Sequence, residues 1–172
     1  MKDIQEIKQN MIATQKLCMR GVFEVCAVNK KAIKPLLNLK SDLEAFLKTY
    51  PENVDAMRFY CYVQCYLLNF KTGLAYLKRT SEISCDIKDK QNLIRLTQIV
   101  ESLKEIVLTP NELVDLGEYL EKALLEPCDH SLKHTKEWLA VNIEKKNHAK
   151  VIKGLQNAGG YCDCEVLANV IV

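Results

Sequence analysis

The sequence has no run of apolar residues that approaches the roughly 18 needed to cross a membrane. Its opening segment, MKDIQEIKQN, also lacks the apolar core of a secretory signal. We therefore expect a soluble, cytoplasmic protein with no membrane partner. Disulfides are rare in such a reducing compartment, so its cysteines are expected to serve in packing, metal binding or catalysis.

Net charge is nearly absent as well, because 24 Lys and Arg residues against 22 Asp and Glu residues leave a formal charge of +2. This balance is too small for the broad positive field that nucleic-acid binding uses, so we predict no nucleic-acid partner. A glycine-rich phosphate loop and a Ser/His/Asp pattern are also missing, which favours a binding module over these familiar enzyme classes.

The sequence does contain helical periodicity. Apolar residues recur at steps of three and four through 3–28, 54–68 and 88–107, a spacing typical of amphipathic helices. Pro35 is expected to interrupt the pattern, and a capping box at residues 41–44 to open a short helix. The sequence therefore predicts a mainly α fold, with a helical lobe over residues 1–108 and a separate unit over 109–172.

Two residues carry clear signals for helix starts. Asn53 precedes a periodic segment and can cap it, and Thr109 opens the pattern TPNE, a capping box with proline at the first helical position. The hairpin at residues 56–79 resembles one tetratricopeptide unit, with Cys61 and Gly73 where such repeats want small residues. The resemblance implies a pair of packed helices in a TPR-like lobe.

Eight cysteines are present, and two sets of them differ in their sequence neighbours. Cys61 and Cys65 stand four residues apart on one helical face without a histidine or acidic neighbour, so we interpret them as packing residues. The last third of the chain differs, because its cysteines have polar, ligand-like neighbours in the segments CDH (128–130) and YCDCE (161–165).

The YCDCEVLANV segment (161–170) follows Gly159, which is expected to end a helix in the left-handed conformation. Its alternation predicts a short terminal strand, so that the C-terminal unit would be α+β. In a strand, Cys162 and Cys164 would project from the same face.

The CDH segment can supply the other half of a metal site. If Asp129 is the N-cap of the next helix, Cys128 and His130 are free to converge, and the helix dipole favours the Cys128 thiolate. Three cysteines and one histidine match a closed tetrahedral zinc site, so we predict the ligands Cys128, His130, Cys162 and Cys164. The identity of the histidine ligand stays open, because His134 lies one helical turn beyond His130 and could replace it.

Both segments together resemble an uncharacterised, mainly bacterial family, a DUF2695-like domain of unknown function that pairs a CDH segment with GGYCDCEVLANV. The resemblance covers about the last third of the chain and includes Cys128, His130, Cys162 and Cys164. It favours His130 over His134, because His130 lies within the shared motif. Since the function of the family is unknown, the resemblance delimits a unit without assigning an activity.

Three functions fit these residues. The first is a protein-interaction module whose C-terminal unit holds a structural zinc ion. The second is an enzyme, with Cys128 or Cys162 as nucleophile and His130 as base, or with a catalytic zinc and Glu165 as base. The third is a redox or metal sensor built on the same thiols. Whether the protein is an enzyme stays open at this point.

Overall fold

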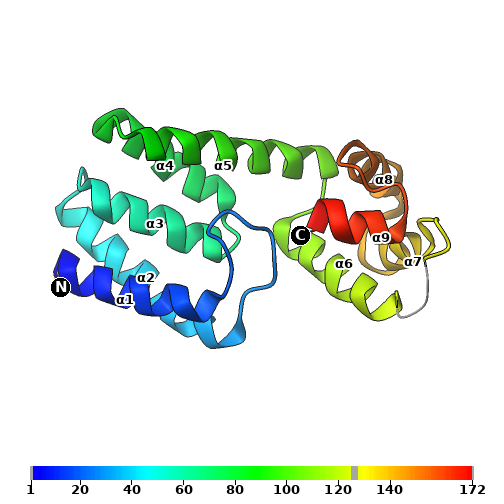
Figure 1. Cartoon of the computed structure of the whole chain (residues 1–172), viewed down its shortest axis with the longest axis horizontal. Coiled ribbons are helices and arrows are strands. Elements are labelled where there is room, and N and C mark those ends of the chain that lie inside the picture. Colours follow the sequence, from blue (N-terminus) through cyan, green and yellow to red (C-terminus); the bar gives the residue numbers. More distant parts are fainter. Residues whose placement is uncertain (1, 125–127, 172) are drawn as a thin grey trace. The chain divides into compact units, whose positions relative to one another are not determined.

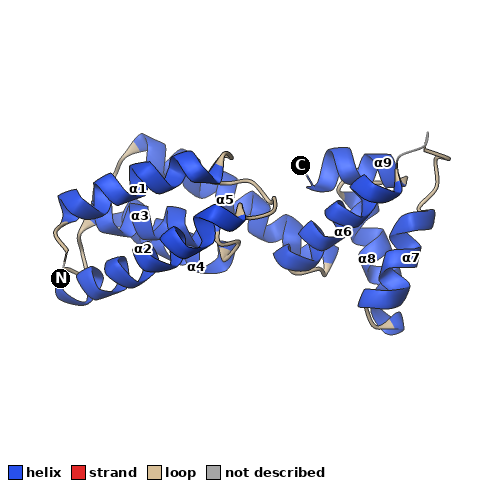
Figure 2. Cartoon of the chain, turned by 90° about the horizontal axis from the view of Figure 1, so that it is seen from below, coloured by secondary structure: helices blue, strands red, loops and turns tan. Residues whose placement is uncertain are grey.

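The computed structural model describes residues 2–124 and 128–171, and every regular element within these ranges is a helix (Figures 1 and 2). The chain divides into two compact units. The N-terminal unit comprises Met1–Glu24 and Val28–Val100, and the C-terminal unit comprises Val25–Ala27 and Glu101–Val172. Two independent domains with a boundary near residue 108 stay a prediction.

The N-terminal unit is an all-helical lobe. Its helices are α1 (Ile4–Cys18), α2 (Lys30–Thr49), α3 (Val54–Tyr66), α4 (Phe70–Ser84) and the first part of α5 (Ile87–Ile106). Its core is lined by apolar side chains from the first three helices, among them Ile7, Met11, Leu36, Leu43, Met57 and Tyr60. Cys61 and Cys65 are fully buried in α3, as expected for packing residues.

Two predicted capping signals are confirmed, whereas the capping box predicted at residues 41–44 lies inside α2 (Lys30–Thr49) and opens no helix. The Asn53 side chain accepts a hydrogen bond of 2.9 Å from the Ala56 backbone N–H at the start of α3. Helix α6 (Pro110–Ala123) opens with the predicted capping box, in which Thr109 and Glu112 each accept a hydrogen bond from the other's backbone N–H. Each cap satisfies donors that a helix N-terminus leaves unpaired.

The predicted interruption of the helix at Pro35 is wrong. Helix α2 runs through Pro35 without a break, from Lys30 to Thr49. The side chain of Asn29, just before α2, accepts a hydrogen bond from the Lys31 backbone. Proline inside a helix costs about 3 kcal/mol, but α2 gains more from a continuous buried face. That face comprises Ala32, Leu36, Leu39, Leu43, Phe46 and Leu47.

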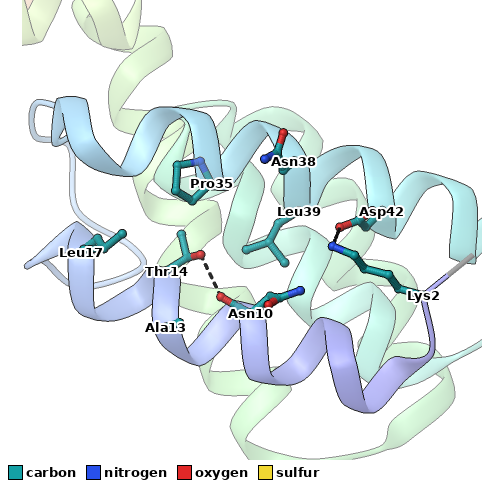
Figure 3. A pocket seen from close by; sticks show the side chains of 9 residues that line it. All are labelled: Lys2, Asn10, Ala13, Thr14, Leu17, Pro35, Asn38, Leu39 and Asp42. Carbon is teal, nitrogen blue, oxygen red and sulfur yellow. Dashed lines mark hydrogen bonds and ion pairs between the residues drawn. The ribbon is translucent and has the colours of Figure 1, made fainter.

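The Pro35 ring lines a cavity of about 300 Å³ between α1 and α2 (Figure 3). One end of the cavity is closed by the ion pair of Lys2 and Asp42, whose atoms are 2.8 Å apart. On its α1 side, the Thr14 hydroxyl donates to the Asn10 carbonyl. The cavity lies beside α2 at the place where this helix contains Pro35.

A buried ion pair fixes the start of α5 against α3. The Asp89 side chain is only 2% exposed and accepts hydrogen bonds from Arg58 at 2.7 to 3.1 Å and from the Ser84 hydroxyl at 2.6 Å. Burial raises the pKa of Asp89, but the hydrogen bonds from Arg58 and Ser84 outweigh it and hold the pKa below its ordinary value.

We expect Asp89→Asn to destabilise the N-terminal unit by about 2 kcal/mol, because it leaves Arg58 without its least exposed carboxylate. Since folding lowers this pKa, the contribution of Asp89 is complete above about pH 4 and is lost as the pH falls through the folded-state value. Urea unfolding at pH 7 and pH 3 measures both effects. Glu6→Gln, at an exposed ion pair, should change stability by less than about 0.5 kcal/mol; equal losses would contradict the prediction.

The C-terminal unit contains the end of α5, α6, α7 (Lys133–Asn142), the 3-10 turn η1 (Lys145–Asn147) and α8 (His148–Asn157). It closes with the short helix α9 (Asp163–Glu165) and the π-helix η2 (Val166–Ile171). Its core includes Leu113, Leu116, Leu120, Trp138, Leu139, Leu155 and Val166. None of the described helices is long and apolar enough to cross a membrane.

The predicted terminal strand, and with it the α+β unit, is wrong. Cys162 is extended, with φ −138° and ψ 168°, but the residues after it turn into α9 and η2. The Glu165 carboxylate accepts a hydrogen bond of 3.0 Å from the Tyr161 N–H, and the Val166 N–H donates to the Cys162 carbonyl. Residues 166 and 170 are also one helical turn apart, so their apolar pattern fits a helix equally well.

At Gly154, helix α8 comes close to the backbone of α5. A Cβ atom there would meet the Glu105 carbonyl oxygen and would lie 2.5 Å from the Ile106 Cα, both in the last turn of α5. Because these are backbone atoms, they cannot move aside as a flexible side chain would. Glycine is therefore required where α8 passes α5.

Candidate metal centre

The two cysteine-bearing segments meet through Asp163. Its backbone N–H donates to the Ser131 carbonyl at 2.8 Å. Its carboxylate accepts hydrogen bonds from the backbone N–H groups of His134 (2.8 Å) and Thr135 (2.9 Å) and from the Thr135 hydroxyl (2.6 Å). Asp163 is therefore the capping residue of α7, although it lies almost thirty residues further along the chain.

The prediction that Asp129 caps this helix is wrong. Helix α7 begins at Lys133, and Leu132, at the N-cap position, supplies no side-chain hydrogen bond. Asp129 instead accepts hydrogen bonds from the Ser131 backbone (3.0 Å) and hydroxyl (2.7 Å), which closes a tight turn. Within this turn His130 adopts a left-handed backbone, with φ 59°.

Side chains of three residues converge at this junction. The sulfur atoms of Cys128 and Cys162 and a ring nitrogen of His130 all lie within 4.8 Å of one another. Cys162 is buried, Cys128 is half-buried and His130 is exposed. The fourth predicted ligand, Cys164, has its sulfur 3.1 Å from that of Cys162. A group of this composition could hold a metal ion.

The thiols differ in acidity. The backbone N–H of Cys164 beside its sulfur, together with that of His130, holds the pKa of Cys128 below its ordinary value. Hydrogen bonding to Cys162, and next to Cys128, raises the pKa of Cys164 to about 12. In the metal-free protein Cys128 is therefore more readily the thiolate, and Cys164 keeps its proton.

The other two histidines have different neighbours. A ring nitrogen of His134 lies 3.0 Å from the Glu137 carboxylate, which also contacts the Tyr119 hydroxyl at 3.3 Å. His148 is half-buried and its ring lies 2.8 Å from the Ile143 carbonyl. The histidine beside Cys128 and Cys162 is thus His130.

The structural role of Asp163 could not be foreseen from the sequence. No local pattern marks a carboxylate that caps a helix from a distant segment. The only signal was its place between two cysteines that were themselves predicted to meet the CDH segment.

Comparison with known proteins delimits the same region. Residues 116–169 match the family model described as "Protein of unknown function (DUF2695)". The C-terminal segment resembles DUF2695 proteins. The DUF2695 segment contains all four predicted ligands and Asp163. The whole N-terminal unit lies outside the matched residues.

Two curated relatives are similar to part of this chain. "Uncharacterized protein Rv2271" of Mycobacterium tuberculosis and "Uncharacterized protein Mb2294" of Mycobacterium bovis are each 35% identical over 66 residues. The match covers 38% of this chain and 65% of each relative, so the chain spans less than two thirds of their length. No solved structure matches the chain.

Proposed function

We propose that the C-terminal unit binds a zinc ion through Cys128, His130, Cys162 and Cys164. The ion would fasten the 128–131 turn to the 161–165 turn. The observation that carries the proposal is the convergence of two thiols and an imidazole within 4.8 Å, with a third thiol beside them. Zinc favours this donor set in tetrahedral structural sites.

The distances leave room for a metal after a small adjustment. In a tetrahedral site with zinc–sulfur bonds of about 2.3 Å, two ligand sulfurs stand about 3.8 Å apart. The Cys162 and Cys164 sulfurs, at 3.1 Å, would separate by a fraction of an ångström. Loss of the Cys164 proton on metal binding removes the thiol hydrogen bond that holds the two sulfurs close.

A structural role is favoured over a catalytic one by the nearby carboxylates. Asp163 is occupied by α7, Glu165 by the Tyr161 N–H, and Asp129 by Ser131. A catalytic zinc would need such a carboxylate as its base, and a cysteine nucleophile would need His130 as its base, which the proposed site uses as a ligand instead. The lowered pKa of Cys128 supports both alternatives alike, because a nucleophile and a redox-sensing thiol both react as the thiolate.

We further propose that the whole protein is a cytoplasmic protein-interaction module. The supporting features are the hairpin of α3 and α4, which resembles a tetratricopeptide unit, and large apolar side chains left exposed in the N-terminal unit. These include Ile12 (48% exposed), Leu37 (50%) and Met19 (85%). Helical surfaces with such side chains are used to dock other proteins.

The zinc site is tested by metal content and by the choice of histidine. We expect protein purified without added metal to contain about one zinc ion. His130→Ala should weaken zinc binding by at least about tenfold, because it removes a direct ligand, whereas His134→Ala should change it less than about twofold. Competition with a chromogenic chelator measures both affinities. Metal-free wild-type protein that also fails to take up zinc or cobalt would refute the site.

A further inference from the structure

We infer that Asp163 is a positioning residue of this site, holding the two ligand-bearing segments in register before any metal arrives. The inference rests on the proposed zinc site and adds to it, since Asp163 is not itself a ligand. It predicts that the metal-free protein already has the ligands close to their bound positions.

Asp163 is built into the unit as a fixed anchor. The residue is 1% exposed, and one of its carboxylate oxygens accepts both donors of Thr135 while the other accepts the His134 N–H. Ionised carboxylates form strong hydrogen bonds with helix N-terminal amides, where the helix dipole also favours negative charge. Such a cap is therefore expected to persist without a metal ion.

Asp163 contacts or adjoins residues next to the predicted ligands in both segments that it joins. Cys162 and Cys164 are its immediate neighbours in the chain, so fixing Asp163 fixes the backbone that carries them. On the other side, its N–H holds the Ser131 carbonyl and its carboxylate holds the first turn of α7. Ser131 directly follows His130, and His130 binds the Cys128 sulfur through its N–H at 3.4 Å.

If Asp163 holds the ligands in place, it should increase the affinity of the site for zinc. A site whose ligands are held in place by the protein spends less binding free energy on ordering them. If Asp163 acted only as a helix cap, its loss would lower thermal stability without a specific loss of zinc affinity in the folded protein. The two roles can therefore be separated by measuring affinity and stability on the same variants.

The experiment uses the full chain and three variants. Asp163→Asn keeps the shape of the side chain and removes its charge. Thr135→Val removes only the hydroxyl donor. Thr109→Ala is the matched control, because it removes the cap of α6 in the same unit without touching either ligand segment. Zinc affinity is measured by chelator competition at a temperature where circular dichroism shows each variant folded.

We expect Asp163→Asn to weaken zinc binding by at least about tenfold and Thr135→Val by about threefold, with Thr109→Ala unchanged. The cobalt spectrum at saturation should stay that of the wild type, since the ligands are the same. Wild-type affinity in Asp163→Asn, or an equal loss in Thr109→Ala, would overturn the inference while leaving the zinc site standing. If Asp163→Asn does not fold, Thr135→Val decides. A wild-type protein that binds no metal would overturn both proposals.

Discussion

Replacing Cys162 with serine is expected to abolish stoichiometric zinc binding, with a loss of affinity above about a hundredfold. Cys162 has the central position, because its sulfur lies within 4.8 Å of donor atoms of Cys128 and His130 and 3.1 Å from the Cys164 sulfur. A serine hydroxyl is a poor zinc ligand at neutral pH, since it does not ionise as a thiol does. Zinc content after gel filtration and a cobalt titration measure the loss.

The control for this variant is Cys85→Ser. Cys85 is an exposed free cysteine in the N-terminal unit, so its loss changes the thiol count without changing the site. We expect it to retain one zinc ion with wild-type affinity. If the Cys162→Ser protein keeps its zinc, the zinc ion is bound elsewhere and not at the predicted site.

Gly154→Ala should be the most damaging small substitution in the C-terminal unit. Alanine normally favours a helix over glycine by about 1 kcal/mol. Here its methyl group would collide with the Glu105 carbonyl and lie 2.5 Å from the Ile106 Cα, so α8 and the end of α5 must separate. We expect a net loss of about 3 kcal/mol, at the upper end of overpacking effects, measured by chemical unfolding of the full chain.

Gly117→Ala offers a matched comparison within a helix of the same unit. Its added methyl group would meet the Ile171 side chain at 2.6 Å, and a side chain can change rotamer where a backbone carbonyl cannot. We expect a loss of less than about 1.5 kcal/mol, since the clash is relieved locally. Equal losses at Gly117 and Gly154 would show that backbone contact is not what makes Gly154 necessary.

Structure that depends on neighbouring residues could be predicted from the sequence. The helix starts at Asn53 and Thr109 could be predicted because each side chain accepts a hydrogen bond from a backbone N–H only three residues away. Pro35 misled the prediction, because the cost of a proline is local while the gain from the buried face of α2 comes from the whole lobe. A strong local signal was thus outweighed by burial that only the fold reveals.

The candidate site shows the same limit more sharply. Cys162 and Cys164 were expected to lie side by side on a strand. Their sulfurs do lie 3.1 Å apart, but Cys162 is the extended residue before α9 and Cys164 lies within α9. Alternation over four residues does not distinguish these conformations. Asp129 was a plausible cap by position, yet the cap came from Asp163, and no pattern in one sequence connects residues so far apart. The metal ligands themselves stay a prediction.

Asp163, Val166 and Ile171 follow α6, α7 and α8 in the sequence, and this order affects folding during translation. A ribosome releases α6, α7 and α8 before the residues that cap α7 and fill the core beside Leu116 and Leu155 exist. The C-terminal unit therefore cannot complete its fold during synthesis of those helices, whereas the N-terminal unit has its core residues by then. During that interval the apolar faces of α6 and α8 lack the side chains of Val166 and Ile171, which belong to the same core in the folded unit.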